Sequence, residues 1–194
     1  MKYVVAVSGG VDSVVLLDLM SKTDHSIVVA HVDHGIREES AADARFVEAL
    51  AKSYGLPYVG TRCELGRHAS EQQAREARYS FLRQQAETFG AAIMTAHHRG
   101  DIIETIALNF VRGTGWRGLA VMGGEKVNRP LVQMSKQQIL AYATRHRLEW
   151  VEDHTNQTDT YLRNRLRKKI NQMVDKSMQD TLLQLRSHQL TLRT

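Results

Sequence analysis

Two patterns of apolar and polar positions alternate along the first part of the chain. Short apolar runs, each bounded by polar residues or glycine, predict buried β-strands. These runs are Tyr3–Val7, Ile27–His31, Leu56–Thr61 and Ala92–Ala96. Longer amphipathic segments with helical spacing lie between them, at Asp12–Lys22, Glu38–Tyr54 and Ser70–Phe89. Strands that alternate with helices predict an α/β fold, with a doubly wound and mostly parallel sheet covered by helices on both faces.

The pattern changes after Arg112. The segment 112–124 (RGTGWRGLAVMGG) is rich in glycine and predicts a loop. Helical spacing returns in three segments, Ser135–Arg147, Thr158–Lys176 and Met178–Leu192. The last of these has a partial stripe of leucines, which is typical of a packing face. We therefore expect a main domain over residues 1–157 and a short, basic helical appendage over residues 158–194.

Charge is distributed unevenly along the 194 residues, whose formal net charge is +5. Residues 1–159 contain 18 Lys and Arg against 19 Asp and Glu, whereas residues 160–194 contain 8 against 2. The positive excess therefore belongs to the carboxy-terminal segment. A basic face beside a near-neutral body is typical of a surface that binds a nucleic acid, although a solvated basic helix has the same composition.

Composition is that of a folded protein, since 42% of the residues are hydrophobic and 24% are charged. The lone Cys63 has no partner for an internal disulfide, and the first residues lack the apolar core of a secretory signal. No apolar run reaches the roughly 20 residues that span a bilayer. From these features we expect a cytoplasmic protein.

The candidate chemistry begins with the run SGGVDS (Ser8–Ser13), directly after the first predicted strand and at the start of the first predicted helix. Gly9 and Gly10 permit torsions that other residues avoid and let amide groups approach a ligand closely. The helix start adds N–H groups and the positive end of the helix dipole, and the two serines add hydroxyl donors. The run predicts a cradle for a phosphate chain. It differs from a Walker loop because it lacks the Gly-Lys-Ser/Thr ending.

Asp12, inside this run, has two interpretations. A carboxylate beside bound phosphates is placed to hold a magnesium ion on a nucleotide. An acidic residue at a helix start is also a common capping acceptor. Because the loop has no lysine, positive charge for the terminal phosphates must come from elsewhere, and this favours the magnesium role.

Six further blocks follow SGGVDS along the chain. They are HVDHGIREES (His31–Ser40), AREARYSFL (Ala74–Leu82), AHHRGDIIET (Ala96–Thr105), RGTGWRGLAVM (Arg112–Met122), RPL (Arg129–Leu131) and WVEDHTNQTDTYLRNRLR (Trp150–Arg167). In this order the blocks resemble the catalytic domain of the tRNA(Ile)-lysidine synthetase family, within the N-type ATP pyrophosphatases of the PP-loop superfamily. The resemblance covers about residues 3–170, and it makes residues 1–157 the N-type ATP pyrophosphatase catalytic domain.

The resemblance implies a reaction and its partners. ATP adenylates the C2 carbonyl of the wobble cytidine in an isoleucine tRNA with a CAU anticodon, and pyrophosphate is released. Free L-lysine then attacks that carbon, AMP leaves, and lysidine is formed. The implied cofactors are ATP and Mg²⁺, and the implied partners are tRNA(Ile), ATP and L-lysine. A homodimer is one assembly that the sequence leaves open.

Candidate site residues follow from the blocks and from the chemistry of their side chains. Catalytic roles are assigned to Asp12, Arg78, Asp101 and Glu104. ATP binding is assigned to the loop and two histidines, namely Ser8, Gly9, Gly10, Val11, Asp12, Ser13, His31 and His34, with Asp12 as the metal ligand. Binding of tRNA is assigned to Arg75, Arg112, Arg163, Arg165 and Arg167.

Ordinary structural roles compete with several assignments. Asp101 and Glu104 share a helix face and suit lysine, metal or nucleotide handling, but they also fit a helix start and a solvated surface. Arg75 and Arg78, one helical turn apart, fit a phosphate clamp or an ordinary surface. A zinc site made of histidines and Cys63 is not expected, because no CxxC pair is present. Aromatic residues do not interleave with the basic ones, so no base-stacking platform is expected.

Two blocks depart from the family pattern. Where the family reads DDQ this chain has Gly100, Asp101 and Ile102, and where it reads EDP the chain has Glu152, Asp153 and His154. Family members also continue into further domains that grip the tRNA. Two other functions therefore compete with lysine transfer. One is a tRNA thiolase, which generally needs more cysteines than one, and the other is a module that binds ATP or RNA without chemistry.

Overall fold

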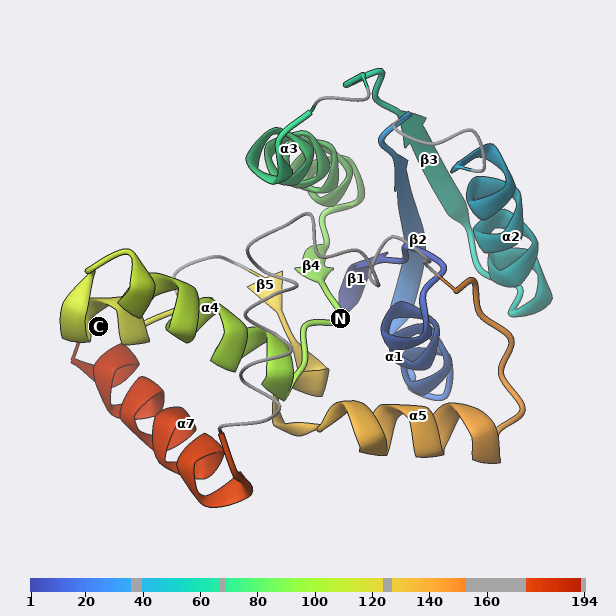
Figure 1. Cartoon of the computed structure of the whole chain (residues 1–194). Helices are drawn as coiled ribbons and strands as arrows, with labels where there is room; N and C mark the ends of the chain where they lie inside the picture. The colour runs from blue at the N-terminus through green and yellow to red at the C-terminus, as the bar shows by residue number, and fades with distance from the viewer. Residues whose placement is uncertain (36–39, 67–68, 124–126, 153–173, 193–194) are drawn as a thin grey trace. The chain divides into compact units, whose positions relative to one another are not determined.

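The computed structural model describes residues 1–35, 40–66, 69–123, 127–152 and 174–192 (Figure 1). The chain divides into two compact units, each with its own apolar cluster. Unit 1 comprises Met1–Ala96, Lys126–Leu131 and Gln137–Glu152, and unit 2 comprises His97–Glu125, Val132–Lys136 and Asp153–Thr194. The domain boundary predicted after residue 157 lies outside the described residues.

In the part of the chain that the structure describes, unit 1 is built on five parallel strands in the order β3-β2-β1-β4-β5. The strands are β1 (Lys2–Ala6), β2 (Ser26–Asp33), β3 (Tyr58–Arg62), β4 (Ala92–Met94) and β5 (Val127–Asn128). The predicted parallel α/β sheet is therefore confirmed. The prediction of a buried strand was wrong for β3, because this strand lies at the edge of the sheet and is only partly buried. The strand β5 was not predicted, because its two residues are too few to form a hydrophobic pattern.

Helices α1 (Val11–Ser21), α2 (Ser40–Ser53) and α3 (Glu71–Phe89) connect the first four strands, and the 3₁₀ helix η2 (Pro130–Gln133) and α5 (Lys136–Arg145) follow β5. The connections from β1 to β2 and from β2 to β3 step in one direction, whereas the connection from β3 to β4 steps back past β1. Because parallel crossovers are right-handed, α3 covers the face opposite α1 and α2, as Figure 1 shows. The strand order thus reverses between β1 and β4, and α/β sheets bind ligands at the carboxyl ends of strands at such a point.

The helix α1, predicted to be amphipathic, is instead buried on most sides. Its consecutive residues Val14, Val15, Leu16 and Leu17 are all 0% exposed. A helix that is apolar all round belongs to the interior of a protein. The loop at the amino-terminal end of α1 is therefore attached to the core of unit 1.

A buried carboxylate joins the end of α1 to two other segments of unit 1. Asp18 is 5% exposed. Its carboxylate accepts hydrogen bonds from Lys22 Nζ (2.7 Å), Tyr142 OH of α5 (2.7 Å) and Tyr54 OH (2.9 Å). Burial by itself raises the pKa of Asp18, but the three hydrogen bonds outweigh it and hold the pKa below the ordinary value of 3.8. Burial and the bond to Asp18 raise the pKa of Tyr54 to about 12.

Replacement of Tyr142 by phenylalanine tests this network. Tyr142→Phe removes a hydroxyl that donates to Asp18 and accepts from Lys22 Nζ at 3.0 Å. We expect the free energy of unfolding to fall by about 1.5–3 kcal/mol, the range for hydrogen bonds to charged groups. Urea denaturation at neutral pH measures the change, with Tyr3→Phe as the control because that hydroxyl makes an exposed contact with Met1 Sδ.

The effect also has a predicted pH dependence. Because folding lowers the pKa of Asp18, the carboxylate stabilises the folded state above pH 3.8, and this contribution is lost as the pH falls through the folded-state value. The difference between Tyr142→Phe and the parent should therefore shrink in acid. Equal urea midpoints for parent and variant at neutral pH would contradict a stabilising role for the network.

In unit 2, α4 (Arg99–Val111), the 3₁₀ helix η1 (Gly115–Leu119) and α7 (Lys176–Thr191) pack around a second apolar cluster. Its buried members are Ile102, Ile106, Leu119 and Val121, with Leu182 and Leu183 of α7 packed against them. The predicted carboxy-terminal helix is therefore confirmed. Its predicted leucine packing face is confirmed for Leu182 and Leu183, whereas Leu185 is 45% exposed. The prediction of a loop over the glycine-rich segment was wrong in part, because this segment contains η1.

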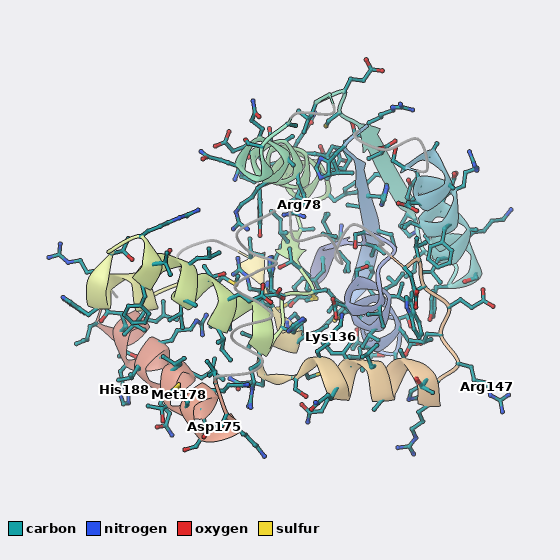
Figure 2. All side chains as sticks on the ribbon, in the orientation of Figure 1. Arg78, Lys136, Arg147, Asp175, Met178 and His188 are labelled. Carbon is teal, nitrogen blue, oxygen red and sulfur yellow. The ribbon has the colours of Figure 1, made fainter. Side chains whose placement is uncertain are left out.

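Polar contacts fix α7 within unit 2. Asp175 Oδ1 caps the helix by accepting a hydrogen bond from the amide of Met178 (2.8 Å), and both residues are labelled in Figure 2. An ion pair joins Arg99 Nη1 to Asp180 Oδ1 (3.1 Å), and Arg186 Nε donates to the carbonyl of Val121 (3.0 Å). The helix predicted at 158–176 lies almost entirely outside the described residues. Within the described ranges, no helix is both long and apolar enough to cross a membrane.

Candidate functional site

Two anchors fix the chain where β1 ends and the SGGVDS run begins. The amide of Val7 donates to the carbonyl of Ala30 (2.9 Å), and His31 Nδ1 donates to the carbonyl of Val7 (2.8 Å). Because a carbonyl only accepts, Nδ1 of His31 carries the proton of this hydrogen bond. The His31 side chain is 4% exposed. His31 therefore supports the entry to the loop, and its contact with ATP stays a prediction.

The two serines of the run hold its ends together. The amide of Ser8 donates to Ser13 Oγ (3.1 Å), Ser13 Oγ donates to the carbonyl of Gly10 (2.8 Å), and the two hydroxyl oxygens lie 3.2 Å apart. Ser13 is 5% exposed, whereas Ser8 is exposed. Both hydroxyls were predicted as donors to a ligand. In the structure Ser13 uses its proton to close the loop, and Ser8 has the accessible hydroxyl.

The two glycines of the run meet different requirements. Gly9 is buried and has φ +93°, in the left-handed region that favours glycine, and its carbonyl accepts a hydrogen bond from the amide of Val151 (2.9 Å). Gly10 is the N-cap of α1, with φ −71° and ψ 158°, which any residue can adopt. An added Cβ at Gly10 would meet Ser8 Oγ at an ordinary 3.6 Å. The turn therefore requires glycine at position 9 but not at position 10.

Asp12 lies in the first turn of α1 and is partly buried. Gly10 occupies the N-cap position, so Asp12 is not the N-cap residue of this helix. Nucleotide sites hold Mg²⁺ with one or two carboxylates, phosphate oxygens and water. One carboxylate beside an anion cradle fits that arrangement. Among the residues that the structure describes, no three His, Cys, Asp or Glu side chains form a group that could hold a metal ion.

Cationic and unpaired polar groups gather near the start of α3 in unit 1. The guanidinium carbons of Arg75 and Arg78 lie 4.7 Å and 5.8 Å from the ring centroid of Tyr79, and Arg78 is labelled in Figure 2. The Tyr79 hydroxyl and His34 Nδ1 are buried without a hydrogen-bond partner among the described residues. Burial lowers the pKa of His34, and the positive charge of Arg78 lowers it further, so His34 is neutral at pH 7. Buried polar atoms without a partner are rare, so this group is a candidate for contact with water or a polar ligand.

At the start of α4 in unit 2, Asp101 has a capping role. His98 is the N-cap, and its Nδ1 accepts from the amide of Gly100 (3.0 Å). In return, Asp101 Oδ2 accepts from the amide of His98 (2.9 Å). The structural interpretation of Asp101 as a residue of the helix start is therefore confirmed. A role in catalysis stays a prediction.

Glu104, one turn further along α4, is only 5% exposed, so the interpretation as a solvated surface residue was wrong. The two departures from the family pattern next to Asp101 have local explanations. A Cβ at Gly100 would lie 2.7 Å from His98 Cε1, so a glycine here suits the capping histidine. Ile102 is 0% exposed and belongs to the apolar cluster of unit 2.

The arginines assigned to tRNA fall in different places. Arg75 belongs to the α3 group in unit 1, and Arg112 is the exposed C-cap of α4 in unit 2. Arg163, Arg165 and Arg167 lie outside the described residues.

Comparison with known proteins shows the family of this chain. A family model described as a PP-loop domain matches residues 1–174. The chain belongs to the PP-loop domain family. Membership implies ATP binding. The name PP-loop is used below for the run Ser8–Ser13, whose contact with ATP stays a prediction.

Curated relatives of this PP-loop domain include proteins named tRNA(Ile)-lysidine synthase. The relative from Enterococcus faecalis is 41% identical over 181 residues, which cover 86% of this chain and 39% of the relative. The relative from Thermus thermophilus is 42% identical over 172 residues, which cover 84% and 34% respectively. The PP-loop chain thus spans well under half the length of these relatives.

Among solved structures, the chain is similar to a U34-tRNA thiolase, NcsA, from Methanococcus maripaludis, with a TM-score of 0.79. The match covers 99% of this chain and 72% of the thiolase chain. The sequence identity is 16%, so this likeness shows the PP-loop fold alone.

Sequence reasoning missed two groups of side chains in this PP-loop domain. Tyr79 went unnoticed, although it directly follows Arg78 in the AREARYSFL block. Phe110 and Trp116 are 50% and 60% exposed. In the sequence, Trp116 lies between Arg112 and Arg117. The run RGTGWRG was itself the signal. The expectation that the chain has no base-stacking platform stays untested.

Proposed function

We propose that this chain is the catalytic part of a tRNA(Ile)-lysidine synthase, a ligase that joins L-lysine to the wobble cytidine of a tRNA(Ile) with a CAU anticodon. The observation that carries the proposal is the 41% and 42% identity to two synthases over most of the chain. The ordered PP-loop, fixed to the core through α1, supports the use of ATP. Because the chain spans less than half of these relatives, the activity of this part alone requires a direct test.

The proposed reaction has two steps. In the first, the cytidine O2 attacks the α-phosphorus of ATP, the bond to the β-phosphate breaks, and pyrophosphate leaves. In the second, the lysine amine attacks C2, the C2–O2 bond breaks, and AMP leaves with that oxygen. The attacking nitrogen loses a proton, so a base is needed beside the lysine.

In this proposal the PP-loop holds the departing pyrophosphate, because the start of α1 offers amide donors and the positive end of the helix. Arg78 adds a cation that stabilises negative charge on the phosphates, and neutral His34 supplies an uncharged polar contact. Asp12 would hold Mg²⁺, which would further offset the phosphate charge.

Glu104 and Asp101 are the proposed lysine-handling groups. A carboxylate attracts the lysine ammonium and accepts its proton before attack. Asp101 Oδ2 also accepts the His98 amide in the α4 cap. We assign Asp101 to the same catalytic set with a second function as a cap.

Arg75, Arg112, Arg163, Arg165 and Arg167 are the proposed tRNA contacts, and residues 158–194 form the proposed basic appendage behind a catalytic domain that ends at residue 157. We also propose a cytoplasmic location, where tRNA and ATP are available and a free thiol such as Cys63 is ordinary. A homodimer is the assembly that light scattering should test.

Two alternatives predict different results. A thiolase is disfavoured because the chain has one cysteine and resembles the thiolase NcsA at only 16% identity. A PP-loop module without chemistry would bind ATP or RNA but transfer no lysine. The local fit of Gly100 and Ile102 to their surroundings removes a reason for preferring that module.

The decisive experiment incubates the chain with ATP, magnesium, radiolabelled lysine and a tRNA(Ile) with a CAU anticodon, and counts label in the tRNA. We expect lysine incorporation with release of AMP, and no incorporation into a tRNA whose wobble cytidine is replaced by uridine. Binding of ATP without incorporation would reject lysine transfer by this part of the protein and favour the binding module.

A further inference from the structure

Unit 2 exposes apolar and cationic side chains at the end of α4 and in η1. Phe110 is 50% exposed, Val111 63% and Trp116 60%. Arg112 and Arg117 are exposed beside them, and the Arg117 guanidinium carbon lies 6.0 Å from the ring centroid of Trp116. We name these five residues the aromatic-arginine patch. Single exposed apolar residues are common, but two aromatics and two arginines within eight consecutive positions form a surface with a definite chemistry.

A constrained turn displays this patch. The amide and the hydroxyl of Thr114 both donate to the carbonyl of Asn109, at 3.1 Å and 2.8 Å, and Asn109 Nδ2 donates to the carbonyl of Gly118 (2.9 Å). Gly113 and Gly115 have φ +74° and +56°, so the turn depends on glycine at both positions. The chain therefore folds back on the last turn of α4, and the exposed side chains are held there before any partner arrives. Such preorganisation reduces the entropy lost on binding.

The positive charge of the patch favours a negatively charged partner. The segment between Glu104 and Glu125 contains no acidic residue, and the only charged side chains within this segment are Arg112 and Arg117. Nucleic acid offers both matching chemistries, since bases have flat faces for aromatic stacking and phosphates attract arginine. We propose that the aromatic-arginine patch binds unpaired bases of an RNA loop, with Phe110 and Trp116 stacking on bases and the two arginines contacting phosphates. The inference rests on the proposed function, because that function makes the RNA a tRNA.

The size of the patch argues against a stable protein interface at this place. An aromatic side chain buries about 150–250 Å² when fully covered. Half-exposed Phe110, Trp116 and Val111 therefore offer on the order of 300 Å² of apolar area, well below the roughly 800 Å² per partner of a stable complex. One or two stacked bases need no more than this area. A second copy of the chain is accordingly an outcome that the test must distinguish.

The test compares two RNA probes and matched variants of the full chain by fluorescence anisotropy. One probe is a hairpin with CAU in its loop, and the other is a blunt duplex of the same length and charge. We expect Trp116→Ala to weaken hairpin binding roughly 5- to 150-fold, the equivalent of losing one stacked base, and to change duplex binding less than about 2-fold. Trp116→Phe should retain hairpin binding because it keeps an aromatic face. Leu140→Ala, at a 39% exposed leucine of α5, is the control for loss of an exposed apolar side chain.

Salt dependence and mass complete the test. Trp116→Ala should leave the salt dependence of binding unchanged, whereas Arg117→Ala should reduce its slope by about one, the loss of one phosphate contact. Hairpin affinity unchanged in Trp116→Ala, or an equal loss for hairpin and duplex, overturns the proposal. So does a change of mass in light scattering without a change in RNA affinity, which would make the patch an interface between copies. If the parent transfers lysine and Trp116→Ala binds the hairpin as tightly as the parent, only this inference is refuted. If the variants change hairpin binding as expected but the parent transfers no lysine, only the proposed function is refuted.

Discussion

Glu104→Gln is expected to lower the rate of lysine transfer to tRNA about 10²- to 10⁴-fold, the range for loss of a general base. The substitution keeps the size of the side chain and removes its negative charge. Because Glu104 is 5% exposed within unit 2, a side chain of equal volume preserves the packing there. Single-turnover lysine transfer measures the effect, while ATP binding by calorimetry should remain within about 2-fold of the parent if the carboxylate acts on lysine alone.

Two further variants separate chemistry from folding at this place. Glu149→Gln removes the charge of an exposed glutamate in unit 1 and should leave lysine transfer unchanged. Asp101→Asn keeps an oxygen that can accept the His98 amide, whereas Asp101→Ala loses the cap and should reduce stability by about 0.5–2 kcal/mol. If Asp101→Asn transfers lysine normally, its carboxylate only caps α4. Normal transfer by Glu104→Gln would remove Glu104 from the catalytic set.

Gly10→Ala is expected to weaken ATP binding at least about tenfold without lowering stability, because the added methyl group stands where phosphate oxygens approach the amides of the PP-loop. The backbone at position 10 accepts alanine, since φ is −71° and the nearest atom to the new Cβ is Ser8 Oγ at 3.6 Å. Calorimetric titration with ATP and thermal unfolding of the same samples measure the two quantities.

Gly9→Ala is the matched comparison in the same loop. At φ +93° alanine is strained by about 1–2 kcal/mol, so this variant should lose stability as well as ATP affinity. Both substitutions are thus expected to weaken ATP binding, but only Gly9→Ala is expected to lower stability. Unchanged ATP affinity in Gly10→Ala would show that phosphates do not approach this part of the loop.

The parallel sheet and the first three helices were predictable because each leaves a pattern several residues long. The PP-loop was predictable because it combines a strand end, two glycines and a helix start in one short run. The strand β5 was not, since the two residues Val127 and Asn128 have no periodicity. The half-buried state of β3 follows from its place at the sheet edge, which depends on strand order and not on local composition.

Side-chain roles were less predictable than elements because they depend on contacts between distant positions. Asp18 and Tyr142 are separated by 124 residues, and their hydrogen bond is invisible to any local pattern. The burial of Glu104 likewise follows from the packing of unit 2, although its spacing from Asp101 was correctly read as one helix face. Trp116 shows the opposite error, because an aromatic residue is expected to be buried and this one is exposed.

The hydrogen bond from the Val151 amide to the Gly9 carbonyl links the PP-loop to a segment more than a hundred residues away, and it uses backbone atoms only. Any amino acid except proline supplies that donor. This bond therefore makes no demand on the side chain at position 151, and it survives an alanine substitution there. A proline scan would reveal the constraint, and conservation scores that count side-chain identity would underestimate it.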